Sequence, residues 1–530
     1  MKQRLLLSLF VLSAATMAWA DVEINEENFP DENFRGFLLE QEYGSDGVLT
    51  EAELAEITSI NVREKFIQSL KGVEYFTALK ELNCRKNQLT ALDVSKNTVL
   101  ESLDCVGNQL TSLDVSQNTA LTKLKCWTNQ LTALDVSKNT ALEYLDCGDT
   151  QLTAIDVSKN IELDTLFIDY NELTDLDVSN NTALTVLCCN DNLLTSIDLS
   201  KNTALKYLDC YDNELTDLDV SKNTALEDLQ CLFNHLTVLD VTKNTALKTL
   251  YCGFNQLTAL DISKNTALEE LECYLCQLTA LDVSKHTALT FLACGYNQLT
   301  ALDVSKNTLL EELYCAANQL TELDVTKNTA LTNLACGGNP IKTLDVSQNP
   351  ALEDLECSQN ELTSLDLSKN PALEELNCEV NQLTSLDVSN NPELNFLGIY
   401  QNRINGENMD ALIESMPTLT DGYMYVLYYE DEENVMTAKQ AAAAKAKGWK
   451  LYHCPGLNEN GRTIWQEYEG GDGIEEMYDE RWTMDDDSLT PTLSKGERAI
   501  YDLQGRRLLS LPKGGRNIYI VNGKKMFNKQ

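Results

Sequence analysis

The residues that could perform chemistry are many acids, an unusual set of cysteines and few histidines. The 530-residue chain contains 17 cysteines and only 3 histidines, which are His235, His286 and His453. His453 and Cys454 are adjacent, but successive side chains of a strand point to opposite faces, so a base and a nucleophile placed this way would not meet. This pair therefore does not predict nucleophilic catalysis.

The cysteines follow a period that favours packing over reactivity. Fourteen of them stand at multiples of 21 residues between Cys84 and Cys378, and isoleucine takes the same position in two further repeats. Stacked in register, their Cβ atoms point the same way and do not converge as disulfide partners must. We predict buried free thiols that act as small apolar side chains. Three cysteines lie outside this ladder and are candidate reactive thiols: Cys188, Cys276 and Cys454.

The acids limit the partners that the chain can have. A net charge of −41 and a pI of about 4.3 argue against DNA, RNA and anionic membranes. One aspartate recurs in fifteen repeats from Asp93 to Asp387, with lysine three residues later in eleven of them. Stacked carboxylates repel one another unless they are bonded or screened, so we predict a structural ladder of backbone-bonded Asp and flanking Lys. A calcium-binding ridge is the alternative.

These columns belong to one repeat of 21 residues. A full unit reads L-x-x-L-x-C-x-x-N-x-L-T-x-L-D-V-S-x-N-T-A, as in residues 100–120. The alternation of Leu103 and Cys105 with Asp104 has the period of a strand, which predicts that the first two face inward. Asn108 and its equivalents close the turn after the strand, and a second asparagine column runs from Asn97 to Asn391.

This unit resembles the leucine-rich repeat, and in particular the short repeats of internalin-like bacterial surface proteins, across residues 57–404. The resemblance implies an α/β-class solenoid with a concave parallel β-sheet, small N- and C-terminal caps and a short all-β tail. Because 21 residues leave little room on the return side, we expect few or no convex helices and an extended or 3₁₀-like return segment.

Aromatic side chains mark where the repeats differ. Between residues 100 and 320, every aromatic residue falls in four columns around the strand and its exit: Trp127, Tyr144, Phe167, Tyr170, Tyr207, Tyr211, Phe233, Tyr251, Phe254, Tyr274, Phe291, Tyr296 and Tyr314. Acids are interleaved with them. We predict that these rings bind a ligand on the concave face, because exposed aromatic patches mark interfaces. The alternative is that the rings pair across strands and only stabilise the sheet.

The N-terminal segments indicate export and a cap. Residues 1–20 have the basic start, apolar centre and small-residue end of a secretory signal peptide. Residues 21–56 predict a helical, EF-hand-like N-terminal cap. Its loop places Glu42, Asp46, Thr50 and Glu53 at calcium-ligand positions. Gly44 stands where such loops carry Asp or Asn, which favours a cap that only keeps the turn geometry. No cofactor is otherwise predicted.

The C-terminal segments indicate a cap, a linker and a sorting segment. Residues 405–468 predict an α/β cap with a helix, a strand and a second helix that ends at Gly448, and residues 469–497 a linker. Residues 498–530 predict short strands divided by glycine turns. They resemble the C-terminal sorting segments of proteins exported by type IX secretion in Bacteroidota-type bacteria, which implies a secreted or outer-membrane cell-surface location.

Three classes of function compete. The leading hypothesis is a monomeric adhesin-like recognition protein that binds a host or bacterial surface protein along the concave face. The second is a glycan-binding protein, since rings beside carboxylates can stack on sugars and hydrogen-bond them. The third is a glycosidase with paired carboxylates; we rank it low and predict no enzyme, because the acids are spread along the array.

Overall fold

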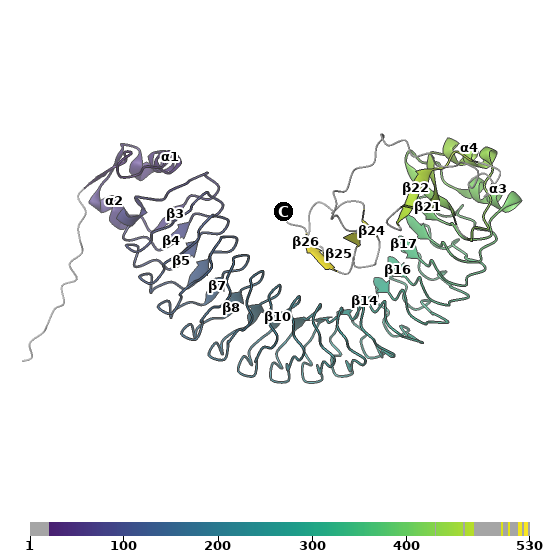
Figure 1. The fold of residues 1–530 in the computed structure, drawn as a ribbon, viewed down its shortest axis with the longest axis horizontal. Coiled ribbons are helices and arrows are strands. Elements are labelled where there is room, and N and C mark those ends of the chain that lie inside the picture. The colour runs from purple at the N-terminus through teal and green to yellow at the C-terminus, as the bar shows by residue number, and fades with distance from the viewer. Residues whose placement is uncertain are drawn as a thin grey trace, which may run out of the picture. The chain divides into compact units, whose positions relative to one another are not determined.

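The computed structural model describes residues 21–429, 431–458 and 462–470, together with the backbone of four short strands after residue 499. The predicted signal peptide, the linker beyond residue 470 and the remainder of the sorting segment lie outside the described residues. The chain divides into two units, Met1–Leu236 and Thr237–Gln530, and each is described by itself (Figure 1).

Unit 1 begins with a small cap. Its elements are β1 (Val22–Glu23), α1 (Glu32–Glu40), η1 (Glu42–Gly44), β2 (Val48–Leu49) and α2 (Glu51–Glu56). Helix α1 starts at Asp31, whose side chain accepts a hydrogen bond from the amide of Phe34. The ring of Phe34 packs edge-on against Phe29, 5.8 Å between centroids, and both are fully buried. Strands β1 and β2 pair antiparallel.

The rest of unit 1 is a run of coils, each with one three-residue strand. The strands are β3 (Ser59–Asn61), β4 (Glu81–Asn83), β5 (Ser102–Asp104), β6 (Lys123–Lys125), β7 (Tyr144–Asp146), β8 (Thr165–Phe167), β9 (Val186–Cys188), β10 (Tyr207–Asp209) and β11 (Asp228–Gln230), with a short 3₁₀ turn η2 (Val73–Tyr75) before β4. They form one parallel sheet without shift of register, so that Leu103 pairs with Leu124 and Leu124 with Leu145.

Unit 2 has the same architecture. Its coils carry β12 (Thr249–Tyr251), β13 (Glu270–Glu272), β14 (Phe291–Ala293), β15 (Glu312–Tyr314), β16 (Asn333–Ala335), β17 (Asp354–Glu356), β18 (Glu375–Asn377) and β19 (Phe396–Gly398). The predicted α/β cap follows as α3 (Gly406–Ser415), β20 (Gly422–Tyr428), α4 (Ala438–Ala446), β21 (Trp449–Leu457) and β22 (Thr463–Glu467). Strands β20 and β21 extend the parallel sheet, and β22 closes it antiparallel.

The predicted inward and outward faces are confirmed. Leu103 and Cys105 are fully buried, whereas Asp104 between them is half-buried. The return segment is built from tight turns: the amide of Asn97 bonds to Val94 O at 3.0 Å and the amide of Leu100 to Asn97 O at 3.0 Å. This spacing of three residues is 3₁₀-like, as expected for so short a unit. The structure is therefore a leucine-rich-repeat solenoid in each unit.

The cysteines are free and buried, as predicted for packing residues. Burial raises the pKa of the Cys294 thiol to about 12, and it shifts the pKa of Cys105 in the same direction. The three cysteines outside the ladder are buried too. Burial raises the pKa of Cys276 and of Cys454, so neither is held as a reactive thiolate at neutral pH.

The asparagine at the strand exit joins successive coils. Asn297 Nδ2 donates to Cys294 O of its own coil at 3.1 Å and to Cys273 O of the preceding coil at 2.9 Å. Its Oδ1 accepts from the amide of Leu278 at 3.0 Å. Two coils depart from this rule: Thr150 Oγ1 donates to Cys147 O at 3.2 Å, and the Cys276 thiol donates only a long bond of 3.6 Å to Cys252 O.

Substitutions in this column should change stability in opposite directions. We expect Asn297→Ala to lower the free energy of unfolding by about 1–3 kcal/mol, because buried carbonyls and the Leu278 amide lose their partner. Cys276→Asn should instead raise it, since the amide would supply the bonds that the thiol lacks. Urea midpoints measure both effects. Destabilisation by both changes would contradict this account of the column.

Candidate functional site

The predicted binding surface consists of four positions in each coil whose side chains do not point into the core. These are the first and third strand residues and the two exit positions, for example Tyr144, Asp146, Gly148 and Asp149 in the coil of β7. We call the set of these positions the strand face of each unit. In-register strands ~4.8 Å apart align each position with its equivalents in the neighbouring coils.

The strand face contains all thirteen predicted rings. The first strand position holds Tyr144, Tyr207 and Phe291; the third holds Phe167, Tyr251 and Tyr314; the first exit position holds Trp127, Tyr211 and Tyr274; the second holds Tyr170, Phe233, Phe254 and Tyr296. Residues of the second exit column have left-handed backbone, with φ of 52° at Phe233 and Tyr296. A side chain there points away from the strand, which widens the face.

Twelve of the thirteen rings are half-buried or exposed, and the expectation of exposure is wrong for Tyr274. Tyr274 is only 5% exposed, whereas Tyr296 beside it is 41% exposed. The Tyr274 ring lies between Phe254 and Tyr296, 5.6 and 5.0 Å away between centroids. It occupies the space that a Cβ on Gly295 would need, 2.9 Å from that position. Glycine in the neighbouring coil thus leaves room for this ring.

Several other rings contact a ring that lies one or two coils away. Tyr144 lies 5.7 Å from Phe167, and Phe291 lies 6.5 Å from Tyr251 and 5.7 Å from Tyr314 between centroids. The alternative of cross-strand stabilisation is therefore partly right. Because these rings keep an accessible side, packing against a neighbour holds them in place without removing them from the surface.

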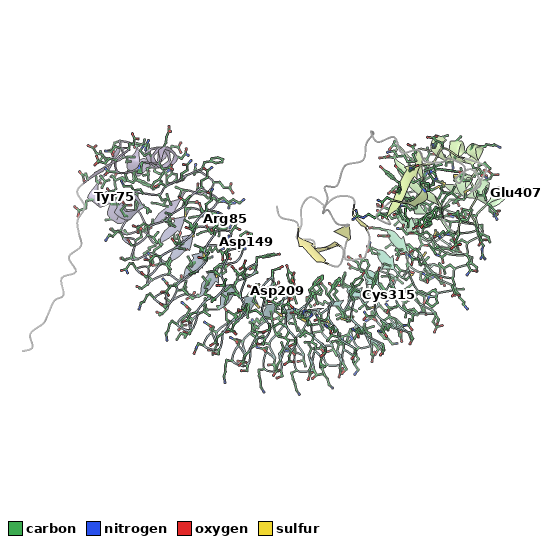
Figure 2. The ribbon with its side chains drawn as sticks, viewed as in Figure 1. Tyr75, Arg85, Asp149, Asp209, Cys315 and Glu407 are labelled. Carbon is green, nitrogen blue, oxygen red and sulfur yellow. The ribbon has the colours of Figure 1, made fainter. Side chains whose placement is uncertain are left out.

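Three carboxyl groups between the rings, those of Asp146, Asp209 and Glu272, are in an environment that disfavours their charge. Figure 2 labels Asp209 and Asp149 on the strand face of unit 1. Asp209 is 8% exposed, and burial, with Asp169 and Asp191 nearby, raises its pKa to about 8 although the amide of Tyr211 bonds to it. Burial and then Asp169 raise the pKa of Asp146 to about 6. Burial raises the pKa of Glu272, in unit 2, to about 7.

Sequence reasoning missed a second aromatic surface, on the cap of unit 2. Trp465 of β22 meets Tyr425 of β20 edge-on at 4.7 Å and Tyr400 at 5.2 Å between centroids. Tyr452 of β21 stacks on Tyr425 at 5.2 Å and on Tyr423 at 6.2 Å, with interplanar angles of 19° and 10°. The alternating tyrosines at 423 and 425 were the available signal, but they lie outside the repeat that defined the predicted site.

The predicted calcium loop is a turn between α1 and α2. Thr50 is the N-cap of α2, and its hydroxyl accepts from the Glu53 amide at 3.3 Å. In return Glu53 Oε2 accepts from the Thr50 amide at 2.9 Å. Asp46 Oδ1 accepts from the amide of Val48 at 3.1 Å, and Glu42 begins the 3₁₀ turn η1. Two of the four predicted ligands are thus engaged in a capping box.

The fifteen repeated aspartates form the predicted backbone-bonded ladder. In each, Oδ1 accepts from the amide two residues later, as from Ser137 to Asp135 at 2.9 Å. Bonds from Ser137 lower the pKa of Asp135.

Within the described ranges, no three His, Cys, Asp or Glu side chains are grouped as metal ligands would be. In the same part of the chain, no helix combines the length and apolarity needed to cross a membrane.

Comparisons with known proteins agree with this architecture. No family model matches the chain. Internalin J of Listeria monocytogenes serotype 4b is 37% identical over 71 residues, which are 13% of this chain and only 8% of that relative's own length. The solved functional domain of InlJ from Listeria monocytogenes, which includes a cysteine ladder, has 37% identity and a TM-score of 0.61, covering 73% of this chain and 83% of that domain.

More distant structures share the fold alone. A leucine-rich-repeat protein of Leptospira interrogans has a TM-score of 0.58 at 24% identity, covering 62% of this chain and 92% of its own. The ectodomain of the Arabidopsis thaliana receptor kinase GASSHO1/SCHENGEN3 was solved with CASPARIAN STRIP INTEGRITY FACTOR 2. It has a TM-score of 0.56 at 20% identity, and the match covers 73% of this chain and 54% of that ectodomain. Fold and repeat define the class as a leucine-rich-repeat protein. The chain belongs to the internalin-like leucine-rich-repeat proteins.

Measurements on the N-terminal cap can distinguish a helix-capping role of its loop from a calcium-binding role. We expect Thr50→Ala to lower the free energy of unfolding by about 1 kcal/mol, because the helix loses its capping box. Millimolar calcium should leave the melting temperature unchanged, and so should Glu42→Gln as control. A calcium-dependent rise in the melting temperature that Glu53→Gln abolishes would contradict this and establish the ion site.

The buried acid on the strand face predicts an unusual pH dependence. Asp209 has a folded pKa of about 8, above its unfolded value, so the folded state holds the proton more tightly and its stability falls as pH rises from about 4 to 8. Asp209→Asn keeps the acceptor for the Tyr211 amide and should raise the melting temperature at pH 7.5 but not at pH 4.

Asp135→Asn is the matched control for this pH dependence. Hydrogen bonds from Ser137 lower the pKa of the native Asp135 carboxyl group. Replacing Asp135 with Asn should therefore lower the melting temperature at pH 7.5. Differential scanning calorimetry at the two pH values measures both variants. Equal shifts for Asp209→Asn at pH 4 and 7.5 would exclude a raised pKa as the cause.

Proposed function

We propose that the chain is an exported recognition protein that binds a protein partner through its strand face. The observation that carries this proposal is the set of twelve accessible rings, aligned in four columns within each unit and interleaved with carboxylates, of which Asp209 and Glu272 are buried. Aromatic residues concentrate at the centres of protein interfaces, and large exposed aromatic patches are rare on surfaces without a partner. The columns that make up the scaffold, by contrast, are nearly identical from coil to coil.

The location and the partner class rest on sequence features. The signal-like residues 1–20 and the sorting-like residues 498–530 support export to the cell surface or the medium, by a type IX-like route. In the second of these segments the structure describes four antiparallel strands, β23 (Ile500–Tyr501), β24 (Arg507–Leu508), β25 (Ile518–Val521) and β26 (Lys524–Phe527), as expected. We therefore propose a monomer that is exported and binds a host or bacterial surface protein.

A second candidate is glycan binding at the cap of unit 2. Tyr423, Tyr425 and Tyr452 form nearly coplanar stacks on β20 and β21, and flat ring platforms are suited to pyranose faces. Burial, with Glu356 nearby, raises the pKa of the acid Glu379 to about 7, and Tyr400 of the cap's ring cluster lies beside it, so a hydrogen-bonding carboxyl group lies in the same region. Its rings are not among the thirteen predicted ones, although β20 and β21 extend the same parallel sheet.

The test compares two sets of substitutions against one purified partner. Candidate surface and serum proteins are screened with residues 21–530, and the affinity for the identified partner is then measured. Changing Trp127, Tyr211 and Tyr251 together to Ala should weaken binding at least about a hundredfold, because each aromatic anchor contributes about 1–2 kcal/mol. Circular dichroism checks that the variant is folded.

The matched control removes exposed apolar side chains from the return side. Val99, Val238 and Leu309 are 42, 69 and 54% exposed, and changing all three to Ala should leave affinity unchanged. Full affinity in the ring variant would overturn the proposal. Binding of a neutral glycan array that depends on Tyr425 and Tyr452, with no protein partner, would favour the second candidate instead.

A further inference from the structure

Positive charge on the strand face is confined to the first four coils. From β3 to β6, the four strand-face columns hold five cations, Arg63, Arg85, Lys86, Lys123 and Lys125, and three acids, Glu64, Glu81 and Asp104. From β7 to β11, the same columns hold seven aspartates and no cation: Asp146, Asp149, Asp169, Asp191, Asp209, Asp212 and Asp228. In a chain of net charge −41, this basic end differs from the rest of the strand face.

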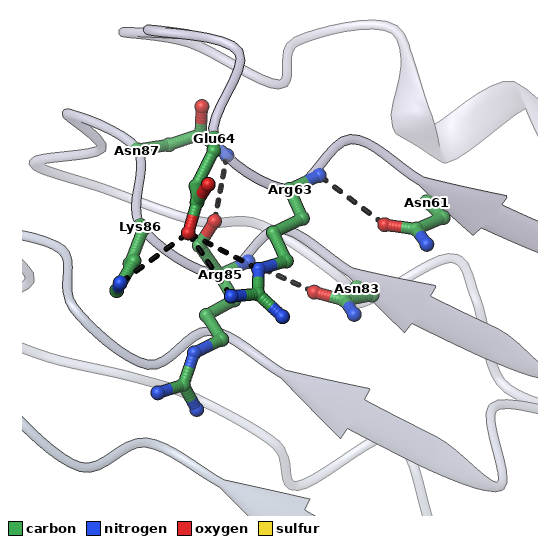
Figure 3. A network of polar contacts seen from close by, with 7 residues as sticks. All are labelled: Asn61, Arg63, Glu64, Asn83, Arg85, Lys86 and Asn87. Carbon is green, nitrogen blue, oxygen red and sulfur yellow. Dashed lines mark hydrogen bonds and ion pairs between the residues drawn. The ribbon is translucent and has the colours of Figure 1, made fainter.

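Two arginines of this basic end occupy equivalent positions in successive coils. Asn61 pairs with Asn83 in the sheet, and each Asn side chain accepts from the amide of the arginine two residues later, at 3.3 Å for Arg63 and 3.1 Å for Arg85 (Figure 3). The amide of Glu64 donates to Arg85 O at 3.0 Å, which ties the two exits together. The backbone therefore holds both guanidinium stems side by side.

The available acid in this network does not pair with Arg85. Glu64 Oε1 accepts from Arg63 at 3.0 Å and lies 3.3 Å from Lys86 Nζ. Within the described part of the chain, the Arg85 guanidinium has no hydrogen bond or ion pair, and its Nε is buried without a partner. A buried donor left unsatisfied destabilises the folded state, and more so when it is charged. The terminal nitrogens of this guanidinium are not among the buried atoms, so an oxyanion from outside would bind there.

We propose that Arg63 and Arg85, with Lys86 beside them, form a subsite for carboxylate side chains of the protein partner. The subsite deepens the proposed function and rests on it. A planar guanidinium matches a carboxylate in bidentate geometry. Trp127 follows Arg85 in the same exit column two coils further on, so an acidic residue with an apolar neighbour would contact both.

The neighbouring coils set the direction in which the partner lies. Lys123 and Lys125 are placed over the Tyr144 ring, at 5.1 and 5.0 Å from its centroid, which fixes them at the border of the basic end. Beyond this border the aspartates of β7 to β11 repel an acidic segment and attract a basic one. The partner's acidic residues therefore lie over β3 to β6, and its basic residues lie over β7 to β11.

The experiment uses a fluorescent oligoglutamate peptide as the carboxylate probe and residues 21–530 as the protein. Anisotropy should show binding at low ionic strength and its loss at about 0.5 M salt. Arg63→Ala/Arg85→Ala should weaken binding at least about tenfold, and Arg63→Lys/Arg85→Lys should cause a smaller loss, because lysine keeps the charge but not the fork. Thermal melts check that each variant is folded.

Lys138→Ala/Lys159→Ala is the matched control, since it removes the same charge from exposed return-side positions of unit 1. It should leave peptide binding unchanged. Equal loss in both pairs would show a net-charge effect and overturn the subsite, as would failure of the native chain to bind the peptide. Binding of a heparin fragment through Arg63 and Arg85 without peptide binding would overturn the assignment to protein carboxylates.

The two proposals fail separately. If the ring variant loses its partner but the native chain does not bind oligoglutamate, the subsite is wrong and the recognition function remains. If oligoglutamate binds through Arg63 and Arg85 while the ring variant keeps full affinity for its partner, the subsite remains and the proposed function is wrong.

Discussion

The side-chain amide of the asparagine that follows most strands is the interaction on which the rest of the structure depends. A three-residue strand followed at once by a turn leaves buried carbonyl and amide groups that its own coil cannot satisfy. In the coil of β14, Asn297 bonds two coils at once, with Nδ2 on Cys273 O and Cys294 O and Oδ1 on the Leu278 amide. A coil is therefore complete only when its neighbour is present, which is why the return side can dispense with long helices.

This division of labour explains why aspartate has opposite properties on the two sides of a coil. On the return side Asp135 accepts hydrogen bonds from Ser137, and its pKa is lowered. On the strand face Asp209 lies among other acids, and burial raises its pKa. The first arrangement favours the charged form and stabilises a turn. The second holds a carboxyl group in a state that an external cation would improve, which favours the strand face over the return side for binding.

The periodic part of the molecule could be predicted because every repeat places the same residue types at the same positions. The buried leucines and cysteines, the bonded asparagines and aspartates and the outward columns all follow from the 21-residue period. The exceptions depend on contacts that no single repeat contains. Tyr274 is buried because Gly295, in the next coil, leaves space for its ring. Only the fold shows that Glu64 forms its ion pairs with Arg63 and Lys86 and leaves Arg85 Nε without a partner. Trp465 reaches the tyrosines of the cap through the antiparallel return of β22, which lies outside the repeat.

Preorganisation is the consequence of this scaffold for binding. Rings such as Phe291 are held by neighbours on both sides, so a partner immobilises few side chains on contact. Asp209 has already lost most of its hydration on folding, so a cation that displaces its proton gains Coulomb attraction with little further desolvation of the carboxylate. The same reasoning applies to the half-buried guanidinium of Arg85 and an anion. Affinity on such a face depends mainly on whether the partner's charges match the register of the coils, and a rigid sheet makes that match selective.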